Sequence, residues 1–86
     1  MPLQISPPPE ETIEQLSNAI RSALPDAHVD VSGGGGHFRI RVVSPRFEGM
    51  SRVAQQRLVY RAIADLMRGE APPVHAVDQL ETMTPR

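Results

Sequence analysis

The seven residues 37–43, HFRIRVV, determine how the rest of the chain is expected to fold. Their apolar side chains stand at every second position and alternate with Arg39 and Arg41, a period typical of a strand with one buried and one open face. Four glycines at 33–36 precede this strand, and residues 27–32 before them also alternate between apolar and polar side chains. Because glycine tolerates a positive φ, the glycine run predicts a hairpin loop between two antiparallel strands.

A helix is predicted upstream of the hairpin. Between Ile13 and Leu24, apolar side chains recur at three- and four-residue intervals, which is the spacing of one helical face. Pro9 suits the first helical position, where its missing N–H costs no hydrogen bond, and Pro25 ends the helix. Residues 1–9 are rich in proline, and we expect them to form a flexible lead.

A second long helix is predicted after the hairpin. Residues 44–50 form a connector with room for a short helical turn, and Ser51 is a suitable N-cap. The helix is expected to run to about residue 68 or 69, because Gly69 and the prolines at 72–73 prevent its continuation. The side chains expected to form its core stripe are Val53, Tyr60, Ile63, Ala64 and Met67, with Val59 and Leu66 beside them.

A third strand is predicted from residue 74 to about 80, followed by a frayed end at 83–86. The resulting order, α-β-β-α-β, predicts one α/β (α+β) domain over residues 10–82. Two hairpin strands, a helix and a third strand form a three-stranded mixed sheet with a right-handed crossover and both helices on one face. Arg39 and Arg41 would then lie on the open face of the sheet.

The composition excludes several classes of function. Cysteine is absent, so this chain alone forms neither a disulfide nor a thiolate metal site. All nine basic residues are arginines, and seven fall between Arg39 and Arg68, although the net charge is −1.

No apolar run reaches the roughly 20 residues that cross a bilayer, and residues 1–10 lack the basic start of a signal peptide, so we expect a cytoplasmic protein. No arrangement of catalytic side chains stands out, and we expect no enzyme.

Several motifs, in order along the chain, carry a resemblance to a known family. The stretch 37–49, HFRIRVVSPRFEG, resembles the pattern HF-x-V-x-VVS-x-x-F-x-G of the BolA family. GMSRV at 49–53, with QQ at 55–56 and VY at 59–60, resembles its YrbA/IbaG subgroup. VHA at 74–76 and TP at 84–85 resemble the last strand and the closing dipeptide of the family. The resemblance covers roughly residues 12–85 and implies a class II KH-like sandwich.

The resemblance also implies a partner and a cofactor. BolA-like proteins pair with monothiol glutaredoxins and share a [2Fe–2S] cluster with the glutaredoxin cysteine and a glutathione thiol. By this resemblance His75, in the VHA motif, is the expected metal ligand, and the isolated chain, a monomer or weak homodimer, is expected to bind no cluster. The implied function is an adaptor in iron–sulfur cluster trafficking, maturation or iron regulation.

The chain departs from the family pattern at the second cluster ligand. The family takes this ligand from a His or Cys in the hairpin loop, whereas residues 33–36 are all glycine. His37, beside the loop, is the nearest replacement, although from position alone either His37 or His75 could be purely structural. The segment 75–85 is also one residue longer than the family pattern, and the usual terminal helix has no counterpart before residue 86.

A DNA-binding transcriptional regulator is the alternative. Arg57 and Arg61, four residues apart on the predicted second helix, share a face and could contact phosphates, an acidic partner or only solvent. Tyr60 is assigned to the core and Phe47 is expected to be buried, which leaves no aromatic side chain to stack on bases. The candidate nucleic-acid residues are Arg46, Arg52, Arg57 and Arg61.

Overall fold

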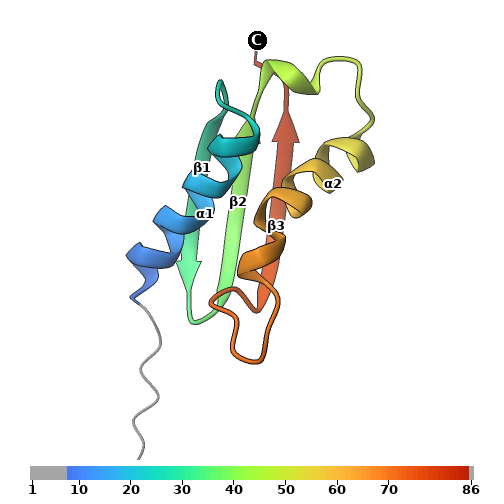
Figure 1. The fold of residues 1–86 in the computed structure, drawn as a ribbon. Coiled ribbons are helices and arrows are strands. Elements are labelled where there is room, and N and C mark those ends of the chain that lie inside the picture. Colours follow the sequence, from blue (N-terminus) through green and yellow to red (C-terminus); the bar gives the residue numbers. More distant parts are fainter. Residues whose placement is uncertain (1–7, 86) are drawn as a thin grey trace, which may run out of the picture.

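The computed structural model describes residues 8–85 and places two helices against a three-stranded sheet (Figure 1). The first helix begins at Pro9, as predicted, and residues 1–7 of the predicted lead lie outside the described part. Within that part, no helix is long and apolar enough to cross a membrane. In chain order the elements are α1 (Pro9–Ala23), β1 (His28–Gly34), β2 (His37–Val43), the 3-10 turn η1 (Pro45–Phe47), α2 (Arg52–Ile63), the 3-10 turn η2 (Ala64–Leu66) and β3 (Ala76–Met83).

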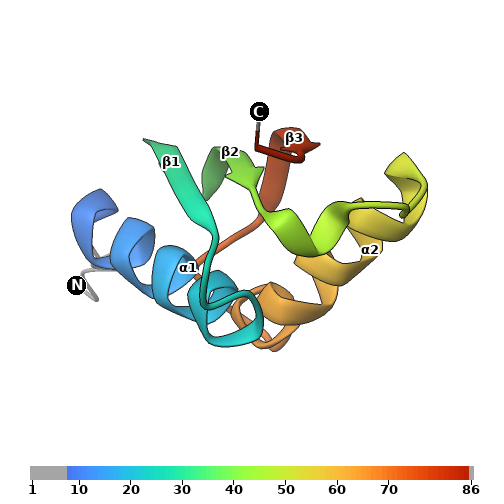
Figure 2. The same cartoon turned by 90° about the horizontal axis from the view of Figure 1, so that it is seen from above.

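The sheet has β2 at its centre. Strand β1 pairs with β2 antiparallel, and β3 pairs with β2 parallel on its other side. Seen from above, α1 and α2 both lie below the sheet and leave its opposite face uncovered (Figure 2). The predicted α-β-β-α-β order, the mixed sheet and the placement of both helices on one face are therefore confirmed.

The hairpin loop is shorter than the predicted four residues. Gly34 pairs with His37, so Gly33 and Gly34 belong to β1 and only two residues make the turn. Gly35 and Gly36 have φ angles of 63° and 85°, and a two-residue hairpin turn with positive φ at both positions suits the right-handed twist of the strands. The other two glycines, Gly33 and Gly34, belong to the sheet because they pair with Phe38 and His37.

The core lies between the sheet and the two helices. Its β2 contribution follows the predicted alternation, and α1 buries the apolar face that its spacing predicts. The helix α2 is stabilised at its start by Ser51, whose Oγ accepts a hydrogen bond from the Ala54 N–H at 3.1 Å. The buried core side chains are Leu16, Ile20, Leu24, Val29, Phe38, Ile40, Val42, Phe47, Val59, Ile63 and Val74.

The predicted core stripe of α2 is partly wrong. Val53 and Tyr60 are 59% and 40% exposed, whereas Val59 and Ile63 are fully buried. The apolar residues of this helix are compatible with more than one stripe, because several lie at helical spacing from one another. The stripe that becomes buried is decided by how the whole helix packs against α1 and β3. Tyr60 is consequently a surface residue.

Two element boundaries differ from the prediction. The regular helix α2 ends at Ile63 and continues as the 3-10 turn η2 rather than as an α-helix to residue 68. Strand β3 runs over Ala76–Met83 instead of 74–80, and Met83 pairs with Val43, so the predicted fraying at 83 is wrong for Met83. The parallel pairing with β2 holds this end of the strand, and sequence patterning alone does not reveal it.

A polar network joins β3 to α2 and to the connector before it. The Thr82 hydroxyl donates to Gln55 Oε1 at 2.8 Å, and the Gln55 amide donates to the carbonyls of Phe47 and Met50 at 3.3 and 3.1 Å. Thr82 is only 7% exposed, and no buried side-chain polar atom of residues 8–85 lacks a hydrogen-bond partner. The network therefore fixes α2 against the sheet at no cost in unsatisfied polar groups.

Candidate functional site

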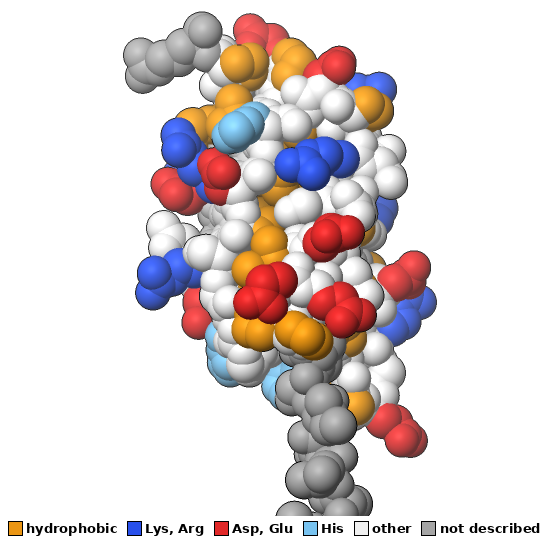
Figure 3. Space-filling view, turned by 90° about the vertical axis from the view of Figure 1, so that its left-hand side faces the viewer, with side chains coloured by type: hydrophobic (Ala, Val, Ile, Leu, Met, Phe, Trp, Pro, Cys, Tyr) orange, Lys and Arg blue, Asp and Glu red, His pale blue; other side chains and the backbone are white. Residues whose placement is uncertain are grey.

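Two histidines lie at the hairpin end of the sheet. His37 is the first residue of β2 and pairs with Ala76, the residue that follows His75. The backbone N–H groups of His75 and Ala76 both donate to the Gly36 carbonyl, at 2.8 and 3.0 Å. Both histidines are exposed, and Figure 3 shows histidine side chains, in pale blue, at the lower end of the molecule where the hairpin turns. The fold therefore brings the two predicted ligands to one end of the sheet.

The His75 ring packs over the hairpin turn. A Cβ placed on Gly36 would lie 2.9 Å from Cγ of His75 and 3.1 Å from its Cδ2, which is closer than side-chain atoms normally approach. Glycine at position 36 adopts the positive φ without strain and leaves room for the close approach of the ring. The turn and the residue before β3 together position this imidazole.

His37 has a carboxylate neighbour that the sequence did not single out. Its Nδ1 lies 3.1 Å from Oδ1 of Asp78, and the two side chains are 57% and 52% exposed. Asp78 stands in a bulge of β3: Phe38 pairs with Val77 and Arg39 with Gln79, which leaves Asp78 without an opposite residue on β2. The extra residue noted in segment 75–85 was a signal for such a bulge, but not for its contact with His37.

The third histidine lies elsewhere. His28 begins β1 and pairs with Val43, at the opposite end of the strand from the hairpin. Its Nε2 lies 3.4 Å from Oδ2 of Asp30, and both side chains are well exposed. This pair is of the same kind as the pair of His37 with Asp78, but it is far along the sheet from His75.

The residues at the hairpin end suit an iron site that a second molecule completes. A neutral imidazole is a suitable iron ligand, and two histidines replace cysteines at one iron of Rieske-type [2Fe–2S] centres. Both His37 and His75 are exposed at the same end of the sheet. Among residues 8–85, no group of three or more His, Cys, Asp or Glu residues could hold a metal ion.

The candidate arginines come from two elements, η1 and α2. Arg57 and Arg61 are exposed on α2, and Tyr60 lies between them in sequence and is also exposed. Arg52 lines a hollow of about 90 Å³ between α2 and β3, together with Gln56. Arg46 is on the η1 turn, outside the helix. The structure corrects the assignment of Tyr60 to the core, and the nucleic-acid role of the four arginines stays a prediction.

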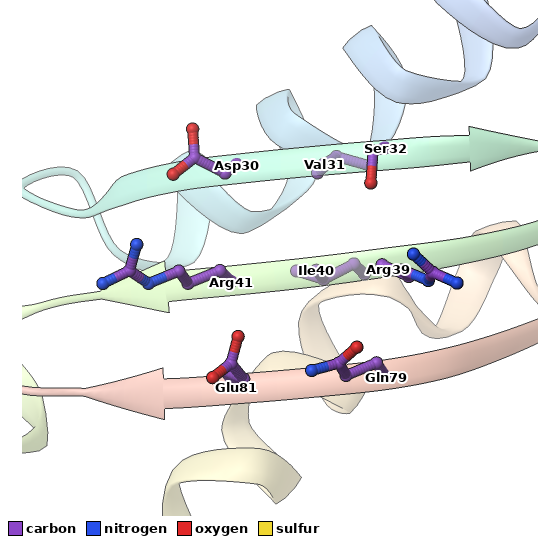
Figure 4. Close-up of a pocket in the computed structure, with 8 residues that line it drawn as sticks. All are labelled: Asp30, Val31, Ser32, Arg39, Ile40, Arg41, Gln79 and Glu81. Carbon is purple, nitrogen blue, oxygen red and sulfur yellow. The ribbon is translucent and has the colours of Figure 1, made fainter.

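The open face of the sheet carries a shallow hollow of about 440 Å³ (Figure 4). Arg39 and Arg41 are exposed on it, as predicted. The strand register sets Arg41 opposite both Asp30 and Glu81, so the charges of this face are balanced across neighbouring strands. The hollow is therefore lined by two basic and two acidic side chains, Arg39 and Arg41 with Asp30 and Glu81.

Comparisons with known proteins agree with this fold. Residues 12–86 match the family model described as BolA-like protein. The chain is 34% identical over 71 residues to acid stress protein IbaG of Escherichia coli, covering 83% of this chain and 81% of that protein. It is 43% identical over 58 residues to mouse BolA-like protein 1, covering 67% of this chain but only 39% of that longer protein.

Solved structures lead to the same family. The chain superposes on a bolA protein homologue from Coxiella burnetii with a TM-score of 0.69 and 33% identity, over 84% of this chain and 88% of that one. The family model spans nearly all of the chain, and the α-β-β-α-β order and three-stranded mixed sheet match a solved family structure. This chain therefore belongs to the BolA family.

Proposed function

We propose that this chain is a non-catalytic adaptor that docks on a monothiol glutaredoxin and shares a [2Fe–2S] cluster with it. His75 would be one ligand and His37 the second, and the glutaredoxin cysteine and a glutathione thiol would supply the rest. The role would lie in cluster trafficking, cluster maturation or iron regulation, in an IbaG-like member of the family.

One observation carries this proposal: two exposed imidazoles from distant parts of the sequence lie at the same end of the sheet. The His75 ring is held against the turn by the contact with Gly36, and His37 begins the strand that leaves this turn. Histidine ligands raise the reduction potential of a [2Fe–2S] centre relative to cysteine ligands alone. The chain itself would present two exposed nitrogen donors at this end of the sheet.

The test is an anaerobic reconstitution of this chain with a monothiol glutaredoxin, glutathione, iron and sulfide. We expect a complex whose visible absorption and circular dichroism differ from those of the glutaredoxin homodimer. His75→Ala should remove most of this difference, and His28→Ala, at the other end of β1, should leave it unchanged. A complex with the same spectrum in the His75→Ala variant would contradict the role of His75, and no spectral difference for the unmodified chain would exclude the shared cluster.

A second candidate function is DNA binding, and the exposure of Tyr60 favours it. The ring of Tyr60, expected in the core from the sequence, is 40% exposed, and Arg61 is the next residue on the helix. Arginines that neutralise phosphates, with an aromatic side chain to stack on a base, form a common binding surface for single-stranded nucleic acid.

Salt dependence of DNA affinity tests this second function. Arg57→Ala with Arg61→Ala should lower the slope of log affinity against log salt by roughly 1.4 to 1.8, because each phosphate contact contributes about 0.7 to 0.9. Arg39→Ala with Arg41→Ala removes the same charge from the open face of the sheet and should change the slope little. Equal losses for both pairs would indicate an effect of net charge and no site on α2.

A further inference from the structure

We propose that Asp78 is a positioning residue that holds His37 in the tautomer able to bind iron. The inference rests on the proposed shared cluster, because it concerns the orientation of the second ligand. It starts from the contact of His37 Nδ1 with Asp78 Oδ1 at 3.1 Å and from the bulge in which Asp78 stands.

The contact determines which ring nitrogen is free. An ionised carboxylate only accepts hydrogen bonds, so the Nδ1 of His37 must donate to Asp78. In the neutral ring the proton then resides on Nδ1, and Nε2 keeps the lone pair that a metal needs. Histidines that ligate metals commonly donate their other N–H to a carboxylate, which fixes both the tautomer and the ring orientation.

The bulge places the carboxylate where the contact is possible. His37 pairs with Ala76, and Asp78 is two residues further along β3, so it is a diagonal neighbour on the same face of the sheet. Because Asp78 has no opposite residue on β2, its side chain is not committed to a cross-strand pair. Asp78 and Gln79 are consequently both exposed, although they are consecutive in a strand.

Through its contact with Asp78, His37 would supply the second ligand that the all-glycine loop lacks. Glycine at 33–36 supplies no ligand, and the turn places Gly36 under the His75 ring, with His37 the next residue along the chain. A histidine at the start of a strand is free to rotate about its side-chain bonds unless a neighbour holds it. Asp78 is the described residue that makes a hydrogen bond to this ring.

The first measurement uses the free chain, without iron. Nitrogen-15 NMR of the imidazoles at one alkaline pH reports the tautomer of each histidine. We expect His37 in the Nδ1–H form in the unmodified chain, a mixture of both forms in Asp78→Ala, and retention of the Nδ1–H form in Asp78→Glu, which keeps an acceptor. Asp30→Ala is the matched control, since it removes the carboxylate beside His28 and should leave the His37 signals unchanged. An unchanged His37 tautomer in Asp78→Ala would overturn the inference.

The second measurement uses the complex with glutaredoxin, glutathione and cluster. Asp78→Ala should weaken cluster retention by about tenfold, the lower end of the usual loss for such a supporting carboxylate, and Asp30→Ala should not. The paramagnetic resonance spectrum of the reduced cluster should show couplings to two imidazole nitrogens in the unmodified complex and a weakened second coupling in Asp78→Ala. Cluster retention and couplings identical to the unmodified complex would overturn the inference.

The outcomes separate this inference from the proposed function. If His75→Ala loses the cluster while His37→Ala and Asp78→Ala keep it, the shared cluster stands and the role of Asp78 fails. If the unmodified chain forms no cluster with glutaredoxin, both fail together. Urea unfolding of each variant is the control that distinguishes loss of the cluster from loss of the fold. Because His37 and Asp78 are exposed, we expect their substitution to change the free energy of unfolding little.

Discussion

Replacing Gly36 by alanine tests whether the hairpin turn positions the His75 ring. The change has two consequences in the structure. Gly36 has a φ of 85°, which alanine adopts only with strain, and the added Cβ would lie 2.9 Å from Cγ of His75 and 3.3 Å from its Cβ. The His75 side chain is exposed and can rotate away, so the ring is expected to move while the hairpin remains intact.

The free energy of unfolding should fall by the sum of two terms. A left-handed backbone conformation costs alanine about 1–2 kcal/mol relative to glycine. Moving the His75 ring off its preferred rotamer adds about 0.5–1.5 kcal/mol. A domain of this size has a total stability of roughly 5 kcal/mol, so Gly36→Ala should remain folded at 25 °C with a clearly lowered midpoint.

Gly35→Ala is the matched control for this prediction. Gly35 also has a positive φ, 63°, but a Cβ at this position would meet no atom within 4 Å. Gly35→Ala should therefore lower the free energy of unfolding only by the cost of the left-handed backbone. The additional loss of free energy in Gly36→Ala is the contribution of the contact with His75. Each kcal/mol of this additional loss corresponds to a difference in Tm of about 4–8 °C.

Urea unfolding followed by circular dichroism measures both stabilities, and NMR spectra report the His75 ring signals. We expect Gly36→Ala to unfold at a lower urea concentration than Gly35→Ala and to shift the His75 signals, which Gly35→Ala should leave near their original positions. Equal midpoints and unchanged His75 signals in both variants would refute the packing of this ring on the turn.

Three further predictions concern the parts that hold the helices on the sheet. Thr82→Val removes the hydroxyl that donates to the part-buried Gln55 Oε1 and should lower the free energy of unfolding by about 1 kcal/mol, because this hydrogen bond is lost; the denaturant midpoint measures it. Ser51→Ala removes the cap on the Ala54 N–H and should cost about 1 kcal/mol in the same assay, and no change would show that the cap is dispensable. Phe47→Ala empties a fully buried site and should cost about 3–5 kcal/mol, so thermal unfolding should show a strongly lowered midpoint relative to the unmodified chain.

The sequence was informative where local physics decides the outcome. The alternation at 37–43 predicted which side of β2 is buried, because the strand period of two residues allows only one assignment. Proline and serine marked where α1 and α2 begin, since the first turn of a helix has a specific chemistry. The candidate ligand His75 came from the resemblance to the BolA family, and its role stays a prediction.

The sequence was less informative where several local solutions are equivalent. Tyr60 and Val59 are adjacent residues on one helix, and the sequence pattern is compatible with either of them in the core. The packing of the helix buries Val59 and leaves Tyr60 exposed. Likewise, four glycines permit a turn at several positions, and the pairing of Gly34 with His37 places it at Gly35 and Gly36. These choices depend on contacts with residues far away in the sequence.

By itself the sequence determined the α-β-β-α-β order, the buried face of β2 and the absence of any thiolate ligand, since periodicity, helix ends and composition are local properties. Only the tertiary structure decided that His75 lies against Gly36, that Asp78 bulges from β3 to meet His37, and that Tyr60 is exposed. The reason is physical: each of these features depends on strand register and on helix docking, which are set by the packing of the whole core and leave no periodic trace in the segments concerned.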